Sequence, residues 1–251
     1  MQEFNEMYDT IELIVQNQKG ILAADESTTT IGKRFDSIGL ENTAENRRAY
    51  RELLFTTPHL EDHISGVILY EETFEQSTVN GQPLAELLIE KGIMPGIKVD
   101  KGLVELAGSN SEKISIGLDD LEARLLHFKA LGARFAKWRN VFQIGPNTPS
   151  QIATKTGAEV LARYAAICQK VGIVPIVEPE ILIDGDHSIE QAAAVCSNVL
   201  HEVFAALYNH HVHLELMILK TSMVTCGKNH KPFSSAEDVA NFTLMVFMNH
   251  V

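Results

Sequence analysis

Short apolar runs recur along the chain, and a longer stretch with apolar positions every three or four residues follows each of them. Within the runs the apolar residues are mostly continuous and do not alternate with polar ones, which is typical of strands buried on both faces. Six runs have the length of a strand: 19–27, 64–70, 94–99, 133–138, 174–177 and 214–220.

The intervening stretches predict amphipathic helices. Thr148-Pro149 predicts the start of one helix, and Ser234 with Glu237 predicts a capping box at the start of the last. Glycines follow several of the periodic segments, as expected at helix ends. The expected helices cover residues 1–18, 44–55, 84–91, 119–131, 148–171, 189–209 and 237–249.

Regular alternation of buried strands and helices predicts an α/β protein with a parallel sheet covered by helices. No linker, low-complexity tract or change of composition divides the chain, so we expect one domain over residues 1–251. Two architectures fit this pattern, a doubly wound open sheet and a (β/α) barrel. The first strand is not followed by Gly-x-Gly-x-x-Gly, which weighs against a dinucleotide-binding fold.

The composition of the chain limits the classes of partner that we expect it to bind. The net charge is −12, with 21 basic and 33 acidic residues, which argues against nucleic acid or an anionic membrane as the partner. A few local cations can still bind an anionic small molecule. Three cysteines without metal-ligand spacing predict free thiols in a reducing compartment. The N-terminal segment resembles no signal peptide and no apolar run has membrane-spanning length, so the expected location is cytoplasmic.

Charged residues cluster where the predicted strands end. In a barrel all strand C-termini meet at one face, which is where catalysis takes place. Lys220 ends an apolar run, and a lysine in such a place is either a nucleophile for a carbonyl or a side chain that reaches to solvent. The strand-end residues favour an active site and comprise Asp25, Lys98, Asp100, Lys137, Arg139, Glu178, Glu180 and Lys220.

Two other patterns favour structural readings. His210, His211 and His213 lie at a helix end without a nearby carboxylate, and a polar turn explains them better than a metal site. We therefore expect no metal. Trp138 follows Lys137 directly and should point to the opposite side of its strand, where it would pack between sheet and helices.

Five stretches, in order along nearly the whole chain, carry a family resemblance. They are Gly20-Ile21-Leu22-Ala23-Ala24-Asp25-Glu26-Ser27, Gly96-Ile97-Lys98-Val99-Asp100-Lys101-Gly102, Phe135-Ala136-Lys137-Trp138-Arg139, Pro175-Ile176-Val177-Glu178-Pro179-Glu180-Ile181-Leu182 and Leu219-Lys220. The sequence resembles the class I, Schiff-base fructose-bisphosphate aldolases of animal type. The resemblance implies a TIM (β/α)8-type barrel, a homotetramer, no cofactor, and cleavage of fructose 1,6-bisphosphate to dihydroxyacetone phosphate and glyceraldehyde 3-phosphate.

The resemblance also implies residue roles. Lys220 would form the Schiff base, and Glu178 would be the general acid and base. Asp25 would help to break the carbon–carbon bond, and Lys137 would support the electrostatics. The implied substrate-binding residues are Lys98, Arg139, Ser27, Thr30, Arg34, Arg47 and Glu180.

The sequence departs from the family in its number of βα units. Only about six are present here, so we expect the family's last two strands, with their phosphate contacts, to be missing. Two alternatives to a working bisphosphate aldolase therefore stay open. One is a catalytically impaired aldolase that acts as a binding or scaffold protein, and the other is a Schiff-base lyase for a smaller sugar phosphate.

Overall fold

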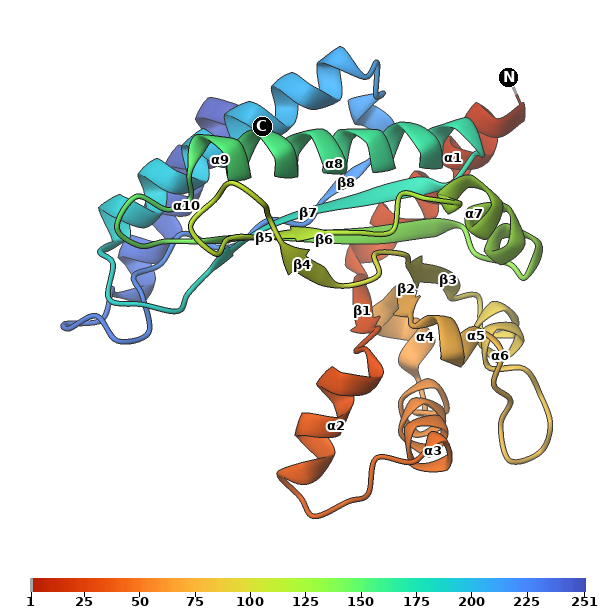
Figure 1. Cartoon of the computed structure of the whole chain (residues 1–251). Coiled ribbons are helices and arrows are strands. Elements are labelled where there is room, and N and C mark those ends of the chain that lie inside the picture. Colours follow the sequence, from red (N-terminus) through yellow and green to blue (C-terminus); the bar gives the residue numbers. More distant parts are fainter. Residues whose placement is uncertain (1) are drawn as a thin grey trace. The chain divides into compact units, whose positions relative to one another are not determined.

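Six strands form one sheet in the computed structural model, which describes residues 2–251 (Figure 1). Met1, the first residue of the helix expected over 1–18, lies outside the described residues. The sheet order is β1-β2-β3-β6-β7-β8, and the pairs of β1 with β2, β2 with β3, β3 with β6, and β7 with β8 are parallel. The strands are β1 Gly20–Ala24, β2 Ile64–Leu69, β3 Met94–Lys98, β6 Phe135–Gln143, β7 Val174–Leu182 and β8 Ile218–Leu219.

The sheet order follows the chain order without a reversal. A doubly wound sheet reverses at its switch point, whereas successive strands of a barrel are neighbours. The order therefore decides for the barrel type of α/β fold. A short antiparallel hairpin, β4 Leu103–Glu105 with β5 Lys113–Ser115, follows β3 and was not predicted.

Among residues 2–251, seven helices occupy the expected stretches, whereas α2 Thr28–Asp36, α4 Leu60–His63 and α5 Glu71–Phe74 were not expected. Thr28 begins α2, because the Ser27 side chain accepts a hydrogen bond from Thr30 N and caps the helix. The 148–171 helix begins at Gln151, since the Ser150 hydroxyl, not Thr148, accepts from the first turn. The last helix is capped by Ser235 with Asp238, one residue beyond the predicted box.

The helices have these bounds: α1 Gln2–Val15, α2 Thr28–Asp36, α3 Ala44–Phe55, α4 Leu60–His63, α5 Glu71–Phe74, α6 Leu84–Glu90, α7 Leu121–Ala130, α8 Gln151–Lys170, α9 Ile189–Asn209 and α10 Ala236–His250. Two short 3-10 turns, η1 Gln16–Gln18 and η2 Leu214–Leu216, complete the secondary structure of the described residues. No helix among them combines the length and apolar character needed to cross a bilayer.

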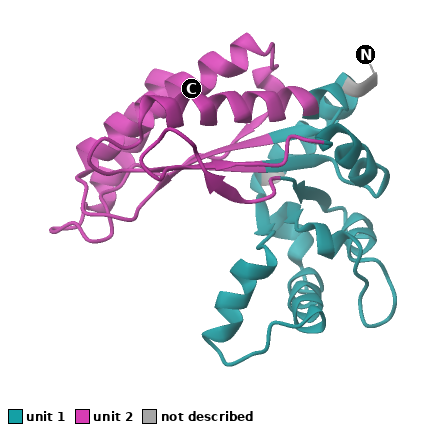
Figure 2. Ribbon diagram, in the orientation of Figure 1, with its two compact units in different colours: residues 1–99, 120–137, 168–175 teal, residues 100–119, 138–167, 176–251 magenta. Residues whose placement is uncertain are grey.

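The chain divides into two compact units, which Figure 2 shows in different colours. Unit 1 comprises residues 1–99, 120–137 and 168–175. Its core is organised around Phe135, which is fully buried. Gly66 and Gly96 make room for this ring, because a Cβ on Gly96 would lie 2.1 Å from Phe135 Cε2 and one on Gly66 would lie 2.9 Å from Phe135 Cε1. These close approaches require glycine in β2 and β3.

Unit 2 comprises residues 100–119, 138–167 and 176–251. Trp138 on β6 is fully buried there, and its ring centroid lies 5.4 Å from that of Tyr164 on α8. The indole N–H donates to the Ser115 hydroxyl over 2.8 Å, so its polar end is satisfied inside the core. The expected packing role of Trp138 is confirmed.

Candidate active site

The middle of β7 and the residue after β8 bring a carboxylate and an amine together in unit 2. β8 pairs with β7 through Ile218 with Ile176 and Leu219 with Val177, and the Lys220 N–H donates to the Val177 carbonyl over 2.9 Å. Lys220 therefore lies beside Glu178, the next residue of β7. The Lys220 ammonium donates to Glu178 Oε1 and forms an ion pair with it. The two residues that the sequence proposed as nucleophile and acid–base partner are in direct contact.

The strand that carries Lys220 is shorter and less buried than its apolar sequence predicted. Leu214–Leu216 is a 3-10 turn, and only Ile218–Leu219 forms β8. The Lys220 side chain is 45% exposed, whereas that of Glu178 is 8% exposed. Of the two alternatives that the sequence left open, this exposure fits a lysine side chain that reaches toward solvent. Contact with the buried carboxylate, and not burial of the amine, is what distinguishes Lys220.

A second ion pair of unit 2 joins Glu180 of β7 to Arg139 of β6. Side chains two residues apart on a strand share a face, so Glu180 lies on the same face of β7 as Glu178. Glu180 accepts hydrogen bonds from the Arg139 guanidinium of β6. The Arg139 backbone N–H also lies 3.4 Å from Asp100 Oδ2. These contacts hold the half-exposed Arg139 beside the carboxylates of Glu180 and Asp100.

Unit 1 contains a buried ion pair at its own strand ends. Asp25 directly follows β1, and its Oδ2 lies 2.7 Å from Lys137 Nζ. The two side chains are 11% and 5% exposed. Lys98 of β3 is in register with Lys137 of β6, so the two lysines are direct neighbours across the strand pair. Asp25 thus follows β1, Lys98 ends β3, and Lys137 lies near the start of β6.

Behind Asp25, a charged network joins the first loop to α3. Glu26 accepts from Arg34 of α2 and forms a second ion pair with Arg51, whose Nη1 lies 2.5 Å from Glu26 Oε2. Arg51 Nη2 also donates to the Glu26 carbonyl over 3.1 Å. Arg51 is only 3% exposed. Sequence analysis missed this residue, because in sequence a buried arginine looks like any other on a charged helix.

The other residues proposed to bind phosphate lie at the start of α2 and on α3. Ser27 and Thr30 lie at the start of α2, where their hydroxyl oxygens are 3.1 Å apart. Arg47 of α3 is already held by Glu72, with two hydrogen bonds of 2.7 Å. Its guanidinium also donates to the Asn42 side chain over 2.9 Å. Arg47 therefore acts as a clamp between α3 and α5 in this structure, whereas Ser27 and Thr30 form the exposed first turn of α2.

The remaining candidates have structural partners. His210 is 2.9 Å from Glu159, and His213 is 3.5 Å from Glu215. Among residues 2–251, no three His, Cys, Asp or Glu side chains are grouped so that they could hold a metal ion. The three cysteines are all buried and unpaired by disulfides. Burial raises the pKa of the Cys196 thiol to about 11, against the opposing effect of a hydrogen bond with Thr221.

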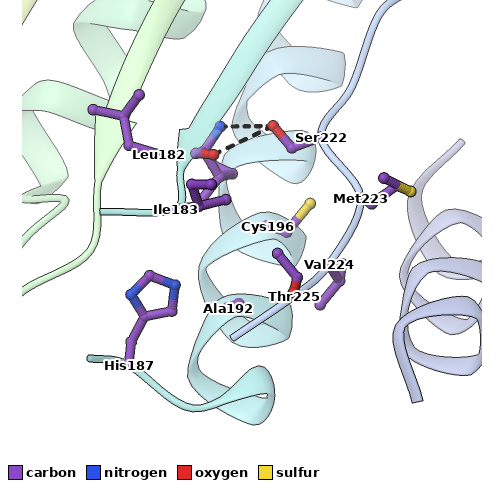
Figure 3. A pocket seen from close by; sticks show the side chains of 10 residues that line it. Leu182, Ile183, His187, Ala192, Cys196, Ser222, Met223, Val224 and Thr225 are labelled. Carbon is purple, nitrogen blue, oxygen red and sulfur yellow. Dashed lines mark hydrogen bonds between the residues drawn. The ribbon is translucent and has the colours of Figure 1, made fainter. Parts of the chain in front are cut away.

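A small cavity of about 10 Å³ lies behind the segment that follows Lys220 (Figure 3). It is enclosed by the end of β7, the start of α9 and residues 222–225, and Ser222, Cys196 and His187 contribute polar atoms to its wall. This volume is about that of one water molecule. The segment after the lysine is therefore packed closely against β7.

Taken together, the parallel sheet and its strand-end lysines and carboxylates define an α/β barrel-type enzyme of carbonyl chemistry. Comparison with known proteins identifies the family. The model of the class-I fructose-bisphosphate aldolase family, described as glycolytic, matches residues 6–251. The chain belongs to this family.

Relatives from distant organisms agree with this assignment. A probable class 1 fructose-bisphosphate aldolase of Xanthomonas campestris pv. campestris is 52% identical over 246 residues, which are 98% of this chain and 74% of that protein. A fructose-bisphosphate aldolase of Echinococcus multilocularis is 54% identical over 244 residues, or 97% of this chain and 67% of that protein.

A solved structure is also closely similar. It is the fructose-bisphosphate aldolase of Plasmodium falciparum, in a complex with TRAP and a small-molecule inhibitor. The TM-score is 0.97 at 48% sequence identity, over 100% of this chain and 73% of that one. The chain thus has the function of its family, that of a carbon–carbon lyase acting through a lysine Schiff base.

Proposed function

We propose that Lys220 is the Schiff-base nucleophile for fructose 1,6-bisphosphate and that Glu178 is its proton-transfer partner. The observation that carries this proposal is the ion pair between them, formed by neighbouring strands. An amine must lose a proton before it attacks a carbonyl, and a carboxylate in direct contact can accept that proton. Glu178 is then protonated beside the carbonyl carbon that Lys220 attacks.

The same carboxyl group serves the next step. Attack of the amine on the ketone gives a carbinolamine, whose hydroxyl must leave as water. Glu178 returns its proton to this oxygen, the carbon–oxygen bond breaks, and the nitrogen lone pair forms the protonated imine. Because Glu178 is buried on β7 directly beside Lys220, it is placed to serve both transfers.

We assign the cleavage step to the Asp25–Lys137 pair of unit 1. Cleavage needs a base for the hydroxyl proton on the carbon that becomes the aldehyde. Its electrons form the new carbonyl as the carbon–carbon bond breaks, and the bond's electrons move to the protonated imine to give an enamine. Asp25 is the base, and the neighbouring Lys137 ammonium, 2.7 Å away, holds its carboxylate in place. Protonation and hydrolysis of the enamine then release dihydroxyacetone phosphate and free Lys220.

The substrate's phosphates and hydroxyls require cations and hydroxyl donors. Lysine and arginine bind phosphate through charge-assisted hydrogen bonds, and Ser and Thr hydroxyls add donors. Glu180 orients Arg139 for this purpose. The proposed substrate-binding residues are Lys98, Arg139, Ser27, Thr30, Arg34, Arg47 and Glu180. Of these, Arg47 has to release part of its contact with Glu72 before it can bind phosphate.

A cleavage assay with two lysine variants tests the proposal. Lys220→Ala should reduce turnover of fructose 1,6-bisphosphate by at least about a thousandfold, because no other group can form the imine. Lys228→Ala is the matched control, since Lys228 follows on the same segment and also pairs with a carboxylate, Asp184. It should retain near-normal turnover. Equal activity of wild type and Lys220→Ala would contradict the assignment.

Fructose 1-phosphate in the same assay tests the substrate. Fructose 1,6-bisphosphate uses cations at both ends, so it should give the higher kcat/KM. A higher kcat/KM for the monophosphate would favour a lyase for smaller sugar phosphates.

We further propose a cytoplasmic homotetramer that folds as one domain. Two of the relatives are cytosolic aldolases of Arabidopsis thaliana, and the family is oligomeric. Reduced, buried cysteines fit a reducing compartment. Analytical ultracentrifugation should give four times the mass of one chain, and a single cooperative unfolding transition would support one domain.

A further inference from the structure

The pairing between β7 and β8 meets an obstacle just beyond the catalytic pair. In a parallel ladder, alternate residues of one strand use both their N–H and C=O toward the neighbour. On β7 these are Val177, Pro179 and Ile181. Val177 accepts from the Lys220 N–H, but Pro179 has no N–H to donate. The ladder therefore loses a backbone donor at the position directly after Glu178.

A side chain replaces the backbone at the next position. The Ser222 hydroxyl oxygen accepts from the Ile181 N–H over 3.0 Å and lies 3.4 Å from the Ile181 carbonyl, to which it donates. Figure 3 shows both bonds, drawn from Ser222 to the end of β7. Ile181 is 7% exposed, so its backbone groups depend on this hydroxyl and not on solvent.

We propose that Ser222 is a positioning residue for the Schiff-base reaction, an inference that rests on the proposed role of Lys220. Two tethers join the segment to β7, one at Lys220 N with Val177 O and one at Ser222 with Ile181. Glu178 lies between these two positions on β7. The hydroxyl therefore fixes the chain on the far side of Lys220 and keeps the amine in contact with Glu178.

The geometry gives a reason for using a side chain here. β8 contains only two residues, and Lys220 follows it with a side chain that is 45% exposed. Packing around the amine is thus too sparse to hold it in one place. A displacement of about 1 Å between reacting groups can reduce a rate by up to a hundredfold. A tether two residues beyond the lysine limits this displacement.

The experiment measures imine formation directly. Enzyme and fructose 1,6-bisphosphate are mixed, the imine is reduced with borohydride at successive times, and mass spectrometry follows the adduct on Lys220. Ser222→Ala should slow adduct formation about tenfold, with KM in steady-state cleavage changed by less than about twofold. Ser222→Thr and Ser222→Val form a shape-matched pair that differs in the hydroxyl, so Thr should restore the rate and Val should not.

Two further variants separate positioning from general stability. Ser65→Ala removes a buried hydroxyl that bonds the Ile14 and Gly20 carbonyls at the start of β2, and it should lower Tm without changing the imine rate. In a Glu178→Gln background, Ser222→Ala should cost less than about twofold, because the hydroxyl acts through the contact between Lys220 and Glu178.

The possible outcomes distinguish a positioning role of Ser222 from a purely structural role, and both from a failure of the Lys220 assignment. An unchanged imine rate in a folded Ser222→Ala protein overturns the inference while leaving the role of Lys220 intact. If Ser222→Ala and Ser222→Val unfold while Ser222→Thr does not, the hydroxyl serves the fold and the inference is equally overturned. Absence of any Lys220 adduct in the wild-type enzyme contradicts the proposed function itself, and the role of Ser222 falls with it.

Discussion

The Lys137 ammonium lies 2.7 Å from Asp25 Oδ2, and both side chains are almost entirely buried. Removing one member of a buried ion pair leaves an uncompensated charge, which costs about 3–5 kcal/mol. We therefore expect Lys137→Met to lower the free energy of unfolding by about this amount and to abolish cleavage. Urea unfolding measures the first effect.

The double variant Asp25→Asn/Lys137→Met is the control for this pair. Because it removes both charges, it should be more stable than Lys137→Met alone. Activity should not return, since the base is gone. Strictly additive losses of stability would contradict a direct interaction between the two residues.

Arg51 should be the most sensitive arginine of α3. It holds both the carboxylate and the carbonyl of Glu26, next to Asp25 and to the Ser27 cap of α2. Arg51→Met leaves a largely buried Glu26 with only Arg34, and we expect a loss of about 3 kcal/mol. Arg48→Met is a control on the same helix: Arg48 pairs with Glu45, which is 72% exposed, and with Glu52, and it is itself more exposed than Arg51, so we expect a smaller loss. Equal losses of stability in urea unfolding would contradict the expected importance of the contact between Arg51 and Glu26.

A substitution of Gly96 tests how closely β3 packs against the Phe135 ring. A methyl group there would overlap the Phe135 ring, so Gly96→Ala should cost at least about 3 kcal/mol. Combining it with Phe135→Leu should recover part of this loss by making room. Gly20→Ala, in β1, is the control, because the nearest atom to its Cβ would be 4.0 Å away. Differential scanning calorimetry on the four proteins would test the overlap, and an undisturbed Gly96→Ala would argue against it.

His187 should make stability depend on pH. Burial lowers its pKa below the ordinary value of 6.5; Asp186 acts to raise the pKa and His230 to lower it. The unfolded chain therefore binds a proton on His187 at a higher pH than the folded chain does. The stabilisation is complete above about pH 6.5 and is lost as pH falls from there through the lower folded pKa.

His187→Gln removes this titration, so its stability should change less between pH 7.5 and about pH 5.5 than that of the wild type. His201→Gln serves as the control, since His201 is exposed on α9. Parallel stability curves for wild type and His187→Gln in chemical denaturation would contradict the burial of a neutral histidine.

Continuous apolar strands and their charged ends could be predicted from sequence, because burial on both faces leaves a direct trace in residue type. The contact of Lys220 with Glu178 follows from this, since neighbouring parallel strands place their ends together. Other features depend on context. The hairpin of β4 and β5 has strands of three residues, which are too short for a periodic pattern. The β-branched Thr28–Thr30 run disfavours the helix that Ser27 nevertheless caps.

Two supporting residues were also beyond prediction. The role of Arg51 depends on burial, which the polar sequence of α3 does not indicate. The tether from Ser222 depends on Pro179, which lies on a different strand and interrupts its ladder. Arg51 and Ser222 both act on residues that are distant in sequence, so their roles can be recognised only in the folded structure.

Borohydride trapping with peptide mapping is the most direct test of the central claim. The purified chain is incubated with fructose 1,6-bisphosphate, reduced and digested, and the modified peptide is sequenced by mass spectrometry. We expect one stable adduct, on Lys220, that is absent from Lys220→Ala and retained in Lys228→Ala. An adduct on another lysine, or none on a folded chain, would contradict the assignment of Lys220 as the Schiff-base nucleophile.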